Sequence, residues 1–233
     1  MLKFMQRCSR TLAAIVVAFF CCVFLLAVPR IGCGMRRRHM LRNAPHLSLA
    51  GYAAVAKSGD VLLFRNNYAP LVFDVTSPFS HVGIVIRHPT TDELFIFETH
   101  DTGDAHAIGV DTGGVHLHPF DARLRTYEGK LWVSRLNKPV PPAKVLEVLS
   151  DASLRDVPFD SKVFQKQFEC FLWPIKSEPT QMKMYCTQFA VHVLQRLGIV
   201  SQSAQKWCAS PMDVRFAPTV DGYEYENAIH LKL

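Results

Sequence analysis

Acidic residues are absent from the first 59 residues of this 233-residue chain, which contain nine Lys and Arg residues. Residues 60–233 therefore carry 17 basic against 20 acidic residues, a net charge of −3, although the whole chain has a net charge of +6. A nucleic-acid-binding domain needs a basic face of its own, and the later part of the chain has no excess positive charge to form one. The composition therefore argues against nucleic acid as a partner.

Cysteine is sparse after residue 59. Only Cys170, Cys186 and Cys208 occur there, and no two of them form a Cys-x-x-Cys pair. An odd, widely spaced set does not make a disulfide framework and lacks the spacing typical of zinc ligands. We therefore expect a reducing compartment, no bound metal and no cofactor.

One long apolar run stands near the N-terminus. Residues 11–28 are eighteen residues without a charge, enough to cross a bilayer, and Lys and Arg flank them on both sides. More basic residues lie after the run than before it, which favours a cytoplasmic location for the rest of the chain. Pro29 makes a poor exit for signal cleavage, so an uncleaved anchor is favoured over a secretory signal or an organelle-import segment. We expect a single-pass membrane protein.

Local composition and hydrophobic pattern divide the chain into three segments. These are an anchor or targeting segment at 1–29, a basic juxtamembrane linker at 30–56 and one folded domain at 57–233. Short β-like runs come first in the domain, and apolar-periodic segments come after them. The expected strands are 61–64, 81–87, 93–98, 115–118 and 131–136, and the expected helices are 143–154, 163–171 and 186–197. Strands followed by helices predict an α+β domain with an antiparallel sheet.

Cys186 begins the last of these expected helices. Apolar residues recur after it at three- and four-residue steps, and Gly198 supplies a stop. A thiol in the first turn of a helix is close to unpaired N–H groups and the positive end of the helix dipole, both of which favour the thiolate. Cys186 is therefore a candidate nucleophile. The alternative is a small buried apolar residue, the commoner role of a free cysteine.

His81 and Glu98 are the candidate partners of that thiol. His81 begins an apolar strand, and Glu98 lies at the end of the next one. A cysteine, a histidine and a carboxylate that orients the imidazole make up a thiol-hydrolase triad. If a four-residue loop joins the strands, the numbers of paired residues add up to 179 or 181, and both side chains share a face. A five-residue loop gives 180 and places them on opposite faces.

Two other patterns carry less weight. His100, His106, His116 and His118 gather in a Gly- and Asp-rich stretch without the spacing of metal ligands, which favours a solvated loop. His116 and His118 would share one strand face. Two Asp-Thr-Gly tripeptides, at 101–103 and 111–113, lie too close together to come from the two lobes of an aspartic protease, and they indicate turns.

Six short pieces, taken in order, resemble the circularly permuted papain-like amidases and cysteine peptidases of the YaeF/YiiX type, in the NlpC superfamily. The pieces are 59–64, 80–84, 95–99, 158–160, 185–189 and 210–214. The resemblance implies a permuted papain-like fold with the histidine strand first and the cysteine helix last. It implies His81 as general base and acid, Glu98 as its orienting partner and Cys186 as nucleophile. Thr187-Gln188 and Phe159 depart from the family pattern, which has Ser-Glu and tyrosine there.

The expected function is that of a membrane-anchored thiol hydrolase that cleaves an amide bond through a thioester. Its expected partners are the membrane, through residues 11–28, and an amide- or acyl-containing substrate, with a lipid or lipid-modified molecule favoured by the anchor. One alternative is a lipid acyltransferase or thioesterase with the same triad, as in the similar lecithin–retinol acyltransferase-like proteins. The other is a catalytically silent binding module in a membrane complex.

Overall fold

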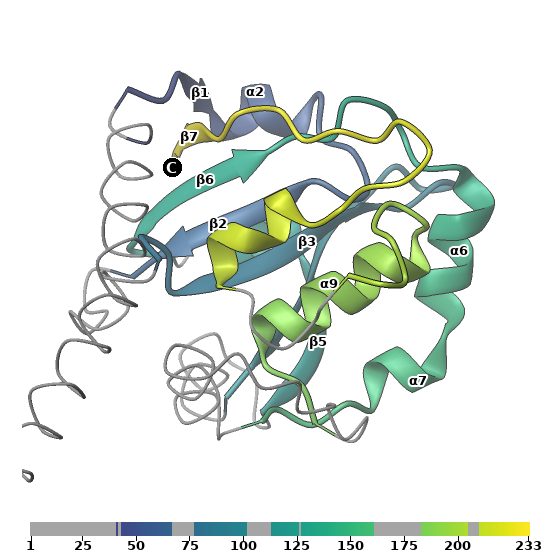
Figure 1. Cartoon of the computed structure of the whole chain (residues 1–233). Coiled ribbons are helices and arrows are strands. Elements are labelled where there is room, and N and C mark those ends of the chain that lie inside the picture. The colour runs from purple at the N-terminus through teal and green to yellow at the C-terminus, as the bar shows by residue number, and fades with distance from the viewer. Residues whose placement is uncertain are drawn as a thin grey trace, which may run out of the picture.

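The computed structural model describes residues 41, 43–66, 77–101, 113–125, 127–160, 183–204 and 210–233. This part of the chain is an α+β fold built on a seven-stranded mixed sheet (Figure 1). Within it, no helix is both long and apolar enough to cross a bilayer. The apolar run 11–28, the expected helix 163–171, His106, Cys170 and Cys208 lie outside the described residues.

The strands succeed one another along the chain as β1 (His46–Ser48), β2 (Val61–Arg65), β3 (His81–Arg87), β4 (Leu94–His100), β5 (Gly114–Pro119), β6 (Lys130–Ser134) and β7 (Ile229–Lys232). Their order in the sheet is β1-β7-β6-β2-β3-β4-β5. Neighbouring strands are antiparallel except for β1 and β7, which run parallel. The sheet is therefore mixed, and the prediction of an antiparallel sheet was wrong at this edge.

The parallel edge comes from a segment that composition had assigned to the linker. Residues 46–48 form β1, and the short helix α2 (Leu49–Ala53) begins directly after it, with Ser48 accepting a hydrogen bond from the backbone N–H of Gly51. Three residues give too little alternation to be recognised as a strand. The strand is specified by pairing with β7, across which His46 lies opposite His230.

The remaining helices lie after the first five strands, and one short helix among them lies between β5 and β6. They are α5 (Phe120–Arg125), α6 (Pro142–Ser150), α7 (Ala152–Arg155), α9 (Cys186–Arg196) and the 3-10 helix η1 (Pro211–Phe216). In Figure 1, α9 and η1 lie across the near side of the sheet.

Alternating side chains divide the sheet into two apolar faces. On the α9 face, Val82 and Ile84 of β3 and Phe97 of β4 belong to one core cluster with Phe189 and Leu194 of α9. On the α5 face, Phe64, Val85 and Ile96 belong to a second cluster with Phe120 and Leu124 of α5, together with Tyr52 of α2. Each strand in the centre of the sheet is thus buried on both sides, which explains the nearly continuous apolar runs in the sequence.

Candidate active site

The turn between β3 and β4 sets the register of the first two candidate residues. The backbone N–H of His88 donates to the carbonyl of Glu93 (2.8 Å), and Asp92 occupies the left-handed region with a φ of 61°. Residues 89–92 therefore form a four-residue loop. Ile84 lies opposite Phe97 and Val85 opposite Ile96, so that the numbers of paired residues add up to 181. This register puts His81 and Glu98 on the same face of the sheet.

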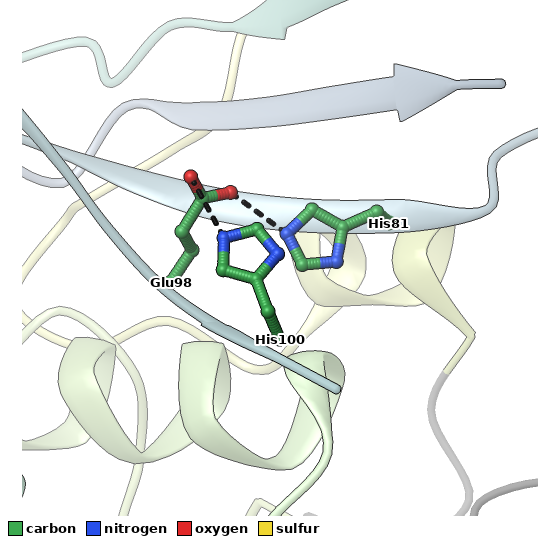
Figure 2. Close-up of side chains that lie close together, drawn as sticks. All are labelled: His81, Glu98 and His100. Carbon is green, nitrogen blue, oxygen red and sulfur yellow. Dashed lines mark hydrogen bonds and ion pairs between the residues drawn. The ribbon is translucent and has the colours of Figure 1, made fainter. Parts of the chain in front are cut away.

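His81 and Glu98 form a hydrogen bond across these two strands. The Nε2 atom of His81 lies 2.8 Å from Oε2 of Glu98. The side chain of Glu98 is fully buried, whereas that of His81 is 15 % exposed at the start of β3. An ionised carboxylate can only accept, so Nε2 carries the proton, and the Nδ1 atom of the neutral ring keeps a lone pair. Figure 2 shows Nδ1 on the side of the ring turned away from Glu98.

Gly83 leaves the space that this hydrogen bond occupies. A Cβ atom at residue 83 would lie 2.7 Å from Cγ2 of Ile96 and 3.4 Å from Oε2 of Glu98. Two residues after His81 along the strand, Gly83 shares its face. The absence of a side chain there lets the Glu98 carboxylate lie flat against β3.

Arg123 of α5 neutralises the buried carboxylate. Its Nε–H donates to Oε1 of Glu98 at 2.6 Å, and its side chain is 7 % exposed. Burial on its own raises the pKa of Glu98, but His100, His81 and Arg123 together hold this pKa well below its usual value. Glu98 is therefore ionised at neutral pH and keeps the imidazole of His81 in one tautomer and one orientation.

His100 is a second imidazole on the same carboxylate. Its Nε2 atom lies 3.1 Å from Oε1 of Glu98, and its ring stacks on that of His81 with the centroids 4.9 Å apart and the planes at 20° (Figure 2). His100 is the last residue of β4 and shares the parity of Glu98, so both point to the α5 face. Burial lowers the pKa of His100, against the opposing effect of Glu98.

The other described histidines of this stretch lie in strands, so the prediction of a solvated loop was wrong for His100, His116 and His118. His116 of β5 lies opposite Glu98, and His118 lies opposite Ile96. The two rings do share one strand face, with centroids 5.3 Å apart. Burial lowers the pKa of His118 to about 4, so this ring is neutral. Pairing with β4 fixes these residues, because their own sequence is too polar to indicate a buried position.

Cys186 is the first residue of α9 and is 8 % exposed. Gln188 holds the helix start, because its Oε1 atom accepts a hydrogen bond from the backbone N–H of Tyr185 (3.3 Å). In the preceding residues, Met184 exchanges backbone hydrogen bonds with Pro158 and Asp160. The thiol therefore lies at the positive end of an eleven-residue helix whose N-terminus is tied to another segment of the fold.

Helix α9 runs alongside β3 in the same direction. The backbone N–H of Gly59 donates to the carbonyl of Val85, and Ile199, just beyond α9, fills the space beside Gly59. The C-terminal end of α9 thus lies near the C-terminal end of β3. Cys186, at the opposite end of the helix, lies at the end of the sheet where β3 begins with His81. Figure 1 shows the same alignment of α9 with β3.

A ring contact locates Cys186 and His81 along α9 and β3. Phe189 of α9 packs edge-on against Phe97, which lies opposite Ile84 of β3. Cys186 comes three residues before Phe189, about 4.5 Å along the helix axis, and His81 comes three residues before Ile84, about 10 Å along the strand.

The sheet nevertheless separates their side chains. His81 and Glu98 point to the α5 face, whereas Cys186 belongs to the core cluster of the α9 face. The structure therefore brings His81 and Glu98 into contact and places Cys186 at the same end of the sheet on its other side. A contact between the Cys186 sulfur and the His81 imidazole would require an approach around the first residue of β3.

Asp60 and Asp213, which lie in two of the other sequence motifs, form hydrogen bonds that stabilise the fold. Asp60 is buried, and its carboxylate accepts hydrogen bonds from the Tyr52 hydroxyl (3.0 Å) and from the backbone N–H groups of Lys57 (3.0 Å) and Leu136 (2.7 Å). It thereby ties α2, β2 and the chain after β6 together. At η1, the Asp213 carboxylate accepts from the backbone N–H (2.9 Å) and the hydroxyl (2.7 Å) of Ser210.

Two members of this cluster were missed from the sequence. His100 could have been found, because it comes two residues after Glu98 and therefore shares its strand face. Arg123 gave no signal, since it lies 25 residues beyond Glu98 in a helix of only six residues. A scan against models of protein families and a search of curated proteins both found no match to this chain.

Proposed function

We propose that this chain is a thiol hydrolase of the permuted papain-like kind, with Cys186 as nucleophile, His81 as general base and acid, and Glu98 as the group that orients His81. The observation that carries the proposal is the 2.8 Å hydrogen bond from His81 to a buried, ionised Glu98, at the end of the sheet where Cys186 begins α9. The chain order, with the histidine strand first and the cysteine helix last, supports the same family.

The proposed reaction is the cleavage of an amide bond. His81 takes the thiol proton, and the thiolate attacks the carbonyl carbon of the substrate. The C–N bond then breaks as His81 returns the proton to the leaving amine, which leaves a thioester on Cys186. Water, deprotonated by His81, hydrolyses the thioester to a carboxylic acid and restores the thiol. The backbone N–H of Cys186, at the start of α9, would stabilise the oxyanion of both steps.

The proposed substrate is a peptide or a lipid-linked amide near a membrane. The basis is the apolar run 11–28 with its basic flanks, which would hold the domain at the bilayer surface. Acyl transfer or thioester hydrolysis on a lipid uses the same three residues and differs only in the acceptor of the acyl group. A substrate panel of amides and acyl-lipids separates these reactions.

A second candidate function is a catalytically silent binding module. The observation that favours it is that His81 and Cys186 belong to opposite faces of the sheet. In such a module, the buried ion pair around Glu98 would serve the fold alone, and Cys186 would be a core residue.

The test is the rate at which iodoacetamide alkylates Cys186 as a function of pH, measured by peptide mapping of the full chain in detergent with a chelator present. The parent, His81→Ala, Glu98→Gln and the control His46→Asn are compared. His46 is an exposed histidine of β1, at the far edge of the sheet. Ordinary thiols react mainly above a pH of about 8.5.

The proposal expects Cys186 to react at mildly acidic pH. At that pH His81→Ala should slow alkylation at least about tenfold, because the thiolate loses its imidazolium partner, and His46→Asn should leave it unchanged. A Cys186 that is inert, or that reacts with the pH profile of an ordinary thiol whether or not His81 is present, would refute the hydrolase and support the binding module.

A further inference from the structure

Three side chains of the α5 face offer ligand atoms to a single point. One atom each from His81, Glu98 and His100 lies within 4.8 Å of the other two. Two imidazole nitrogens and one carboxylate oxygen are the donor set that Zn²⁺ and neighbouring transition metals take, whereas Mg²⁺ and Ca²⁺ require mostly oxygen. The three residues come from two paired strands, which fixes their backbones relative to one another.

The carboxylate is held in the way that a metal ligand needs. Arg123 binds Oε1 of Glu98 at 2.6 Å and leaves Oε2 directed at the imidazole of His81. Carboxylates that bind a metal through one oxygen usually have the other oxygen hydrogen-bonded to the protein, which orients them. Arg123 also cancels the charge of Glu98, so the imidazoles would have to provide most of the affinity.

The buried imidazole of His100 shares its partner atom with Arg123. Its side chain is 2 % exposed, and Nε2 lies 3.1 Å from Oε1 of Glu98, the oxygen that already accepts a hydrogen bond from Arg123. A buried ring nitrogen in this state loses its hydration without full compensation. A metal ion bound at Nε2 would remove that deficit.

The ring of His118 lies next to that of His100, outside the group of three. The ring centroids of His100 and His118 are 5.6 Å apart, and Nε2 of His118 is buried without a hydrogen-bond partner in the described part of the chain. A neutral imidazole is the form that binds metals.

We propose that His81, Glu98 and His100 form a binding site for one divalent transition-metal ion of the Zn²⁺ class. Binding requires that Nε2 of each histidine give up its proton, with the remaining N–H on Nδ1, while Oε2 of Glu98 binds the metal and Oε1 stays on Arg123. The metal thereby replaces the hydrogen bond between His81 and Glu98. Where this inference rests on the proposed function, it predicts that the metal-bound form is the inactive state of the hydrolase.

The experiment is a calorimetric titration of the metal-free full chain in detergent with Zn²⁺, together with the visible spectrum of the Co²⁺ form. It is carried out on the parent and on Cys186→Ser, which removes the thiol as a competing ligand. We expect one Zn²⁺ to bind in both proteins, and no saturable binding of Mg²⁺. His100→Asn and His81→Asn should each weaken Zn²⁺ binding at least about tenfold, whereas His46→Asn should not change it. His81→Asn changes a residue at the more exposed end of β3, so it provides the test if His100→Asn fails to fold.

Three results would overturn the site. These are the absence of saturable Zn²⁺ binding, binding that is lost in Cys186→Ser but kept in His100→Asn, and equal losses in His100→Asn and His46→Asn. Binding and the Co²⁺ spectrum need no substrate and no turnover, and the alkylation test above is run with a chelator. Each proposal can therefore fail while the other stands. If both hold, Zn²⁺ should abolish the His81-dependent alkylation of Cys186 at mildly acidic pH.

Discussion

Replacing Arg123 should destabilise the domain through the loss of one charge. The guanidinium and the Glu98 carboxylate are both buried and in contact at 2.6 Å. With an effective dielectric constant of about 20 and charge centres about 4 Å apart, their attraction is about 4 kcal/mol. Arg123→Met keeps most of the side-chain volume but leaves a buried carboxylate without its closest partner. The expected loss in the free energy of unfolding is about 3–5 kcal/mol.

The assay is urea denaturation at neutral pH with a chelator, monitored by tryptophan fluorescence. Arg125→Met is the matched control, because Arg125 is exposed at the end of the same helix and should cost less than about 1 kcal/mol. The double variant Arg123→Met/Glu98→Gln removes the unpaired charge and should be more stable than the sum of the two single changes indicates. A loss in Arg123→Met no greater than in Arg125→Met, or strictly additive effects in the double variant, would refute the reasoning.

Two further substitutions test the packing and the hydrogen bonds around the site. Gly83→Ala should cost about 1–3 kcal/mol in unfolding free energy, because its Cβ meets Ile96 at 2.7 Å, and a stability equal to that of the parent would contradict the packing. Asp60→Asn should cost a similar amount, since an amide N–H cannot accept the hydrogen bonds that Asp60 receives. Burial raises the pKa of Asp60, so the parent loses stability as the pH rises through that pKa. The deficit of Asp60→Asn should therefore be largest at acidic pH, which denaturation at several pH values would check.

The centre of the sheet could be predicted because its residues are buried on both faces. The strand 81–87 was predicted with the bounds that the structure has, since an apolar run ends at polar residues on both sides. The start of α9 at Cys186 was predicted from the helical period of its apolar residues. By contrast, β1 and β7 are short and half polar. Pairing with β7 defines β1, and pairing with β1 and β6 defines β7, which no local pattern reveals.

The candidate site could be predicted only in part. The types and order of His81, Glu98 and Cys186 are visible in the sequence, but the contact between the first two depends on a register that one residue of loop length would reverse. The turn geometry at Asp92 decides it. Arg123 reaches Glu98 through the packing of α5 on the sheet, which is a tertiary property. The face of the sheet on which Cys186 lies likewise depends on where α9 packs.

The parallel pairing of β1 with β7 affects when the sheet can be completed. β7 lies between β1 and β6, so β1 has no partner until residues 229–232 have been made, and its partner His230 lies 184 residues beyond His46. Contacts at such a distance along the chain form late, because a long loop has to close first. During synthesis, the segment next to the basic N-terminal region therefore stays unpaired, and the edge of β6 stays open, until that last strand emerges from the ribosome. We therefore expect β1 to join the sheet late in folding.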